Sequence, residues 1–323
     1  MRFPMSLTRC MKAAALLVFT FLACLCGASN SALAYSCSVS VTSLAFGNVD
    51  VLSGSAIAST AALSISCSGA PANALRMCIN INGGTASDST SRQMSGPGSN
   101  QLRYQLFSDS TRTTPWGSWS ANLYGGGFQW DVPNSSSNVN AATTVYAQVL
   151  ASQPTIVPGS YASTLTVSMN YLDNTATPCP GAGQGAATNT FTTSATVVSN
   201  CTVGAATLNF GSAGVLTTNL DSGSSLNLLC SNTLPYTISL NGGNSGATDP
   251  TQRKMSSGAN EVTYGIYRDS ARTLPWGWTA GTDTVGGTGT GLSRAINAFG
   301  RVPAQTTPGP GTYQDTVVVT VTY

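Results

Sequence analysis

Six cysteines are the residues whose types and spacing point most clearly to chemistry. They follow residue 34, where a predicted export signal, described below, ends. An even number of cysteines in an exported chain indicates disulfides. None of them has the C-x-x-C spacing that is typical of a bound metal ion. The six are Cys37, Cys67, Cys78, Cys179, Cys201 and Cys230.

Residues that an enzyme would need are scarce. The chain contains no histidine, which excludes every triad, dyad and metal set that requires imidazole. Lys254 is the only lysine after residue 34, and it has no serine three residues before it. Asp88, Asp109, Asp249 and Asp269 occupy matched positions of a repeat, which favours turns over catalytic carboxylates. We therefore expect no enzyme and no cofactor.

One module occurs twice in the chain. Cys37-Ser38-Val39 and Phe46-Gly47 recur 164 residues later as Cys201-Thr202-Val203 and Phe210-Gly211. Two domains are expected, residues 35–186 and 187–323, each large enough for one core. We expect the repeated tryptophans in the cores and the repeated Asp and Arg residues in turns, as ion pairs or as caps on backbone amides. The repeated structural residues are Tyr104, Asp109, Arg112 and Trp116 in the first module and Tyr264, Asp269, Arg272 and Trp276 in the second.

Short alternating apolar runs, separated by Gly, Pro, Asn and Asp, predict β-strands throughout both modules. No helical period is sustained after residue 34, which favours two antiparallel β-sandwiches over a parallel sheet. The repeat pairs Cys37 with Cys67 and Cys201 with Cys230, and each bond stabilises its domain by roughly 3 to 4 kcal/mol in the chain-entropy model. Cys78 is then left with Cys179, and an inter-domain or intermolecular bond is the alternative.

Residues 1–34 predict a secretory signal peptide. Arg2, Arg9 and Lys12 precede an apolar run that ends in small residues. A membrane anchor is the alternative, but the run is shorter than the about 20 residues that cross a bilayer, and a lipoprotein modified at Cys24 is another. Without this segment the chain is nearly neutral, which gives no electrostatic case for nucleic acid or an anionic membrane.

A further strand is predicted between the modules. Residues 188–199 place Phe191, Ala195 and Val197 on one face. We interpret residues 187–200 as a donor-like strand that completes the first domain within the same chain. Before Cys37 the mature chain is expected to keep only Tyr35 and Ser36, so the first module has no comparable strand to give away.

Several of these blocks closely resemble the spore coat protein U domain. The resemblance covers the whole second module and, more loosely, the first. In many bacteria such domains are similar to subunits of archaic chaperone-usher pili. The resemblance implies immunoglobulin-like, pilin-type sandwiches that lack the last strand, which the next subunit supplies. The blocks are Cys201-Thr202-Val203, Phe210-Gly211, Tyr264 to Asp269, Trp276-Gly277 and the closing run from Gly311 to Tyr323.

Together with the strand at 188–199, the resemblance implies a two-domain tip adhesin that mediates surface attachment and biofilm formation. Its second domain, which lacks the last strand, would accept one from a neighbouring pilin subunit. The other expected partners are a periplasmic chaperone, an outer-membrane usher and an abiotic or host surface, and the protein would travel through the periplasm to the cell surface. The alternative is a structural coat, matrix or pilus shaft protein without its own ligand site.

A Gly-rich segment of the first module supplies candidate surface-binding residues: Tyr124, Phe128, Trp130 and Val132. The corresponding segment of the second module, residues 281–292, has no aromatic residue. Exposed aromatic side chains on such loops suit apolar surfaces or sugar rings. The alternative is that these residues are half-buried in a longer sheet.

Overall fold

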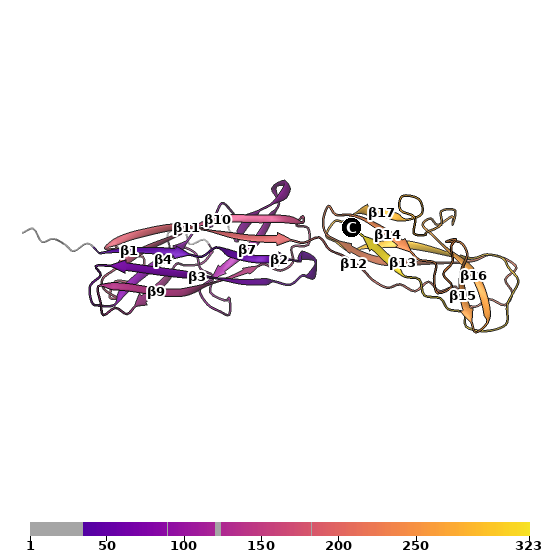
Figure 1. The fold of residues 1–323 in the computed structure, drawn as a ribbon, viewed down its shortest axis with the longest axis horizontal. Helices are drawn as coiled ribbons and strands as arrows, with labels where there is room; N and C mark the ends of the chain where they lie inside the picture. The colour runs from indigo at the N-terminus through magenta and orange to yellow at the C-terminus, as the bar shows by residue number, and fades with distance from the viewer. Residues whose placement is uncertain (1–34, 89, 120–123, 182) are drawn as a thin grey trace, which may run out of the picture.

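The computed structural model describes residues 35–88, 90–119, 124–181 and 183–323. The predicted signal peptide lies outside the described residues, as does the beginning of the Gly-rich segment. The described elements are β-strands and two single 3-10 turns, so the all-β prediction is confirmed. Figure 1 shows two β-sandwich domains arranged end to end, the first from indigo to salmon and the second from orange to yellow.

Eleven strands and two 3-10 turns form domain one. The strands are β1 (Ser36–Val41), β2 (Leu44–Val49), β3 (Ile57–Ser68), β4 (Leu75–Ile81), β5 (Ala86–Ser87), β6 (Arg92–Ser95), β7 (Gln101–Phe107), β8 (Phe128–Val132), β9 (Asn138–Val149), β10 (Gly159–Leu172) and β11 (Gly185–Val197). The turns are η1 (Val51–Ser53) and η2 (Pro97–Ser99).

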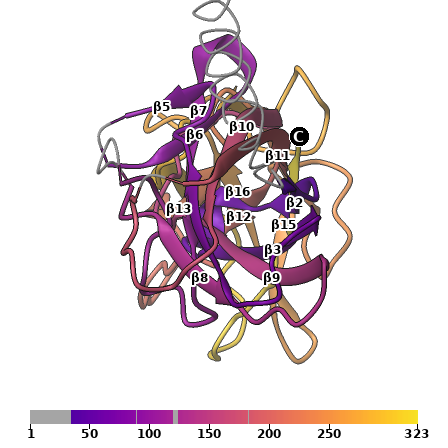
Figure 2. The same cartoon turned by 90° about the vertical axis from the view of Figure 1, so that its left-hand side faces the viewer.

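These strands bond in the order β1-β3-β9-β7-β6-β10-β11-β2. Strand β4 pairs with the edge of β10 opposite β11, and β8 pairs with β4. Strand β6 pairs with β7 and touches β10, so one layer continues into the other around a single core. Figure 2 views the molecule from the domain-one end, with β10 and β11 lying across from β3 and β9.

Alternation decides which side chains enter this core. Leu63, Ile65 and Cys67 of β3 point inward and are at most 3% exposed, while the serines between them face solvent. The inward residues of β10 follow the same period of two. The Ser, Thr and Asn residues that make the chain so poor in charge therefore lie on the outer faces of the strands.

Domain two repeats most of this plan with eight strands. They are β12 (Cys201–Val203), β13 (Leu220–Cys230), β14 (Pro235–Leu240), β15 (Arg253–Ser257), β16 (Asn260–Tyr267), β17 (Val285–Thr288), β18 (Arg294–Val302) and β19 (Val319–Thr322). The order β12-β13-β18-β16-β15 matches β1-β3-β9-β7-β6, and β17-β14-β19 matches β8-β4-β10. Among the described strands of domain two, none corresponds to β11 or β2, so this domain lacks its last strand.

The three disulfides join the expected pairs, of which two follow from the repeat and the third by elimination. Cys37 and Cys67 are direct cross-strand neighbours on β1 and β3, with Cα atoms 4.0 Å apart. Cys201 and Cys230 hold the same place on β12 and β13, at 4.1 Å. The third bond, Cys78–Cys179, ties the segment before β11 to β4 within domain one.

A buried arginine binds the main chain of the tryptophan that recurs in each module. Arg92 and Arg253 are fully buried and donate to the main-chain oxygens of Trp116 and Trp276, each at 2.8 Å. Each tryptophan in turn donates its indole N–H to a carbonyl of β4 or β14. Burial lowers the pKa of Arg92 to about 10, which still leaves the guanidinium charged at neutral pH.

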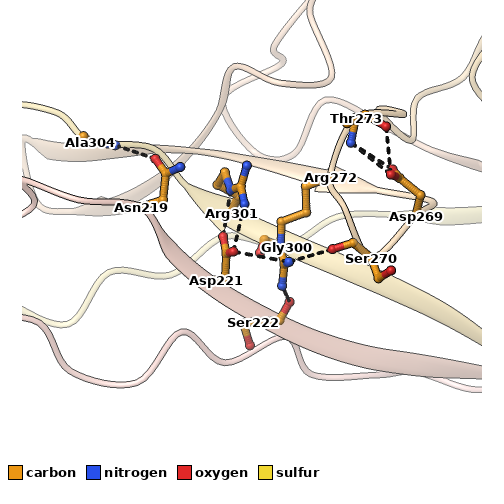
Figure 3. Close-up of polar contacts among 10 residues, drawn as sticks. All are labelled: Asn219, Asp221, Ser222, Asp269, Ser270, Arg272, Thr273, Gly300, Arg301 and Ala304. Atoms are coloured by element: carbon orange, nitrogen blue, oxygen red, sulfur yellow. Dashed lines mark hydrogen bonds and ion pairs between the residues drawn. The ribbon is translucent and has the colours of Figure 1, made fainter.

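The repeated aspartates cap turns. Asp109 accepts hydrogen bonds from the amides of Thr113 and Thr114. In domain two, Asp269 accepts the equivalent bonds from Leu274 and from Thr273, the latter drawn in Figure 3. The hydrogen bond from Thr111 contributes most to holding the pKa of Asp109 far below its usual range.

The repeated arginines of these turns face away from the aspartates. Arg112 donates to the Ala147 carbonyl, and Arg272 donates to the Gly300 carbonyl at 2.9 Å (Figure 3). Arg272 is also 3.2 Å from the Asp221 carboxylate on β13. Of the two roles that the sequence allowed for these aspartates, capping is therefore the one formed.

Candidate strand-accepting site

Strand β11 lies inside the sheet of domain one. It pairs antiparallel with β10 from Gly159↔Val197 to Tyr171↔Gly185, and parallel with β2 on its other side. The strand begins at Gly185, two residues before the predicted boundary, and residues 198–200 lead into domain two. A segment that separates the two modules in sequence is therefore a strand of the first sandwich.

One face of β11 fills the core of domain one. Phe191, Ala195 and Val197 are between 2% and 4% exposed and belong to the buried cluster of that domain. Thr193 lies on the same face and is fully buried. Sequence reasoning missed this threonine because its side chain is polar, although the period of two places residue 193 between 191 and 195.

The buried hydroxyl of Thr193 has a defined partner. Thr193 Oγ1 donates to the phenol oxygen of Tyr104 at 3.2 Å and lies 3.5 Å from the Ser163 carbonyl. Thr193 and Ser163 are also direct cross-strand neighbours on β11 and β10. The inner face of β11 therefore combines an apolar contact surface with one hydrogen-bond donor.

The edge of domain two is open where β11 would lie. Residues 312–322 of domain two correspond to the β10 region from Ser160 onward, yet only Val319–Thr322 form a strand, and it pairs with β14. Before it, Gln314 makes a single bridge to Ser256, as Ala162 does to Ser95 in domain one. We call residues 313–322 the open edge of domain two.

The apolar residues beside this edge are only partly covered. Val317 and Val319 are half-buried, whereas their counterparts Leu165 and Val167 are fully buried under β11. The segment around Phe210 likewise forms no strand and leaves that ring half-buried, because its counterpart β2 pairs with β11. The same positions therefore differ in burial according to whether β11 is present.

The aromatic surface expected in domain one is not formed. Phe128, Trp130 and Val132 lie on the inner face of β8, where Val132 is buried and the two rings pack against the core. The Phe128 ring lies 4.6 Å from that of Trp116, centre to centre. The prediction of an exposed binding loop was wrong for these residues because alternation along β8 turns them inward.

Tyr124 is also buried rather than displayed. Its hydroxyl donates to the Asp88 carbonyl, and the Arg92 guanidinium lies 5.0 Å from the centre of its ring. It is 9% exposed, which leaves little of its ring for a ligand. Phe128 and Trp130 therefore match the half-buried alternative, whereas Tyr124 and Val132 are buried and Tyr124 lies outside the strand.

Few other features of the described residues offer chemistry. No three His, Cys, Asp or Glu side chains gather there in a way that would hold a metal ion. No helix in that part of the chain is long and apolar enough to cross a membrane. Asp131, the acid of the Gly-rich segment, is paired with Arg76, whose hydrogen bonds lower the pKa of this carboxyl.

Comparison with known proteins identifies the family. Residues 24–168 and 187–320 match the Spore Coat Protein U domain. The chain belongs to this family. A curated relative, protein U of Myxococcus xanthus, is 29% identical over 191 residues, which span 59% of this chain and 99% of the relative.

Solved structures of pilus proteins are also similar to this spore coat protein U domain chain. One is the CsuC–CsuE chaperone–tip adhesion subunit complex of archaic Csu pili from Acinetobacter baumannii, with 19% identity and a TM-score of 0.48 over 89% of this chain and all of the matched chain. Another is the CupB6 tip adhesin of Pseudomonas aeruginosa, with 13% identity and a TM-score of 0.36 over 90% of this chain and 94% of the other.

Proposed function

We propose that the protein is a non-catalytic subunit of a surface fibre of the archaic chaperone-usher type, in which domain two accepts a β-strand from a neighbouring subunit. One observation carries this proposal: β11 completes domain one, while the matching edge of its homologue, domain two, is open. The occupant is a strand because β11 shows what fills this place in the same module.

An open edge of this kind is unfavourable for an isolated protein. Unpaired backbone N–H and C=O groups beside half-buried valines form a template for unwanted strand pairing. Strand addition satisfies both the backbone groups and the apolar surface at once. We propose that a periplasmic chaperone covers the edge until an usher delivers the neighbouring subunit, which would protect the edge from such pairing.

The proposed position is the tip of the fibre. β11 is held between β10 and β2, so this strand is not available to another subunit. Domain one would then face outward and contact an abiotic or host surface, with attachment and biofilm formation as the outcome. Three disulfides suit the oxidising route through the periplasm to the cell surface.

A structural coat, matrix or shaft role is the second candidate. It is favoured by the inward orientation of Tyr124, Phe128, Trp130 and Val132, which removes the aromatic surface expected of an adhesin. Attachment of particles coated with domain one to polystyrene and to glycan arrays separates the two roles. Binding above that of particles coated with domain two supports the adhesin, and equal binding supports the structural subunit.

Strand acceptance is tested with a peptide that copies residues 185–198. The full chain is incubated with the peptide, and hydrogen exchange is followed by mass spectrometry. We expect slower exchange in residues 207–213 and 312–322 of domain two, because the added strand pairs with their backbone. Residues 159–172 of domain one serve as the internal control, since β11 already covers them.

A scrambled peptide of the same composition controls for non-specific association. Unchanged exchange at the open edge over a peptide range up to millimolar would contradict strand acceptance by domain two. Protection of residues 159–172 in place of 312–322 would show that the peptide displaces β11 and would equally contradict the assignment.

A further inference from the structure

The buried part of the inner face of β11 carries one polar side chain, Thr193, and the residues that would surround this position in domain two are different. In domain one, Tyr104 receives the Thr193 hydroxyl, and Ser163 lies opposite the threonine on β10. The matching residues in domain two are Tyr264 and Asp315. A carboxylate therefore stands where domain one has a hydroxyl.

The two phenols occupy the same place in their domains. Phe46 meets the Tyr104 ring at 6.0 Å and 67°, and Phe210 meets the Tyr264 ring at 6.0 Å and 68°. Tyr104 is fully buried and Tyr264 is 4% exposed. The hydrogen bond between Thr193 and Tyr104 in domain one therefore indicates which contact an added strand would make with Tyr264 in domain two.

Asp315 fixes the direction of the hydrogen bond at this position. The Tyr264 hydroxyl donates to Asp315 Oδ2 at 2.6 Å, while Oδ1 accepts the Asn244 amide at 2.7 Å. The carboxylate fits against Gly243, whose φ is +72° and where a Cβ would come within 2.1 Å of Oδ2. The loop that contains Gly243 and Asn244 therefore fixes the position of the Asp315 carboxylate.

The protonated state of the phenol is equally well fixed. Burial, and next the hydrogen bond to the Asp315 carboxylate, raise the pKa of Tyr264 far above its ordinary value. An ionised carboxylate only accepts, so the phenol proton is committed to Asp315. What the phenol oxygen can still offer to an added strand is its capacity to accept a hydrogen bond.

This conclusion rests on the proposed strand acceptance and adds its specificity. We infer that domain two selects a donor strand with a neutral hydrogen-bond donor, serine or threonine, at the position that faces Asp315. The hydroxyl would donate to the Tyr264 phenol oxygen as Thr193 donates to that of Tyr104. An acidic residue there would meet an acceptor and a carboxylate, and an aliphatic residue would give the buried phenol oxygen, which already donates to Asp315, no hydrogen bond to accept.

The test uses peptides that copy residues 185–198 and differ only at position 193. The parent peptide has threonine there, and the variants are Thr193→Ser, Thr193→Val and Thr193→Asp. Affinity for the full chain is measured from the protection of residues 312–322 against hydrogen exchange as a function of peptide concentration. We expect the serine peptide to match the parent, the valine peptide to bind about tenfold more weakly, and the aspartate peptide about a hundredfold or more.

A matched peptide controls for the added charge. Ser194 is exposed on β11 and faces away from the core, so Ser194→Asp adds the same charge one residue away on the outer face. We expect this peptide to bind within about threefold of the parent, because an exposed charge costs little. The difference between the two aspartate peptides then reports the inner position alone.

Variants of the protein test the role of Asp315. Asp315→Ser installs the residue of domain one and frees the phenol proton. We expect the penalty of the Thr193→Asp peptide to fall by at least tenfold in this variant, since the phenol can then donate to the added carboxylate. Asp315→Asn is a second variant of similar size, and exchange of the unbound proteins verifies that each remains folded.

The outcomes separate this inference from the function on which it rests. If no peptide protects residues 312–322, strand acceptance itself fails. If the threonine, valine and aspartate peptides bind equally, strand acceptance stands and the selection by Tyr264 and Asp315 is overturned. Preference for the valine peptide would also overturn it, because the position would then be purely apolar.

Discussion

The two domains share one module but differ in whether its sandwich is closed. In domain one, Leu165 and Val167 are fully buried because β11 covers them, whereas Val317 and Val319 remain half-buried in domain two. All large hydrophobic side chains that are exposed in the described residues lie in domain two. They are Val215, Leu274, Trp278, Leu292, Val318 and Tyr323. Burial at the matched positions is therefore set by the added strand and not by the local sequence.

Strand regularity follows the same rule. β10 runs for 14 residues in domain one, while β19 of domain two has 4. The residues of domain two that match β2 form no strand. A strand is defined by its hydrogen bonds to neighbouring strands. In the absence of a β11 equivalent, the counterpart of β10 is therefore short and the counterpart of β2 forms no strand.

The largest effect that tests this comparison is expected from Phe191→Ala. The ring is 4% exposed and pairs with Leu165, so its removal leaves a cavity in the core of domain one. We expect the free energy of unfolding of domain one to fall by about 3 to 5 kcal/mol. Hydrogen exchange across a urea series, read separately for each domain, measures the change.

Thr190→Ala is the matched control on the exposed face of the same strand. It should change the stability of either domain by less than about 0.5 kcal/mol. A loss in domain two that equals the loss in domain one on Phe191→Ala would show that β11 stabilises both domains. Such a result would remove the distinction between a closed and an open sandwich.

A second prediction compares the same residue in the two domains. Phe46 is 7% exposed beside β11, whereas Phe210 is half-buried at the matched position. We expect Phe46→Ala to cost domain one about 3 kcal/mol and Phe210→Ala to cost domain two about half as much. Urea unfolding resolved by domain gives both values.

The peptide that copies residues 185–198 tests whether the missing strand causes the difference between Phe46 and Phe210. A strand bound at the open edge covers Phe210, so the cost of Phe210→Ala should rise towards that of Phe46→Ala when the peptide is present at saturation. The cost of Phe46→Ala should not change. Equal costs in the absence of peptide would indicate that the edge of domain two is already closed by some other means.

The repeat, the disulfide partners and the strand at 188–199 could be predicted from the sequence because each depends on the spacing of residues along the chain. Sequence reasoning could not assign Phe128, Trp130 and Val132, since alternation separates two faces without saying which one another layer covers. Tyr124 precedes β8, so alternation assigns it to neither face. Thr193 was missed for the related reason that a polar residue reads as outward unless its partner is known. That partner, the Tyr104 phenol, lies 89 residues away in sequence.

The smallest effect concerns an ion cluster of domain two that has no counterpart among the described residues of domain one. Asp221 accepts two hydrogen bonds from Arg301, at 2.7 and 2.9 Å, and lies 3.2 Å from Arg272 (Figure 3). The matched positions in domain one are Ala58 and Gln148. We expect Asp221→Ala to lower the free energy of unfolding of domain two by about 1 kcal/mol at neutral pH, because the pair is partly exposed.

The pH dependence distinguishes this cluster from loss of packing. The hydrogen bond from Arg301 is the main cause that lowers the pKa of Asp221 in the folded protein. A carboxyl with a lowered folded-state pKa stabilises above its unfolded pKa of about 4, and this contribution is lost as the pH falls through the folded value. The difference between wild type and Asp221→Ala should therefore shrink below about pH 4. Arg301→Gln is the matched variant, and a difference that persists at pH 2 would assign the effect to packing.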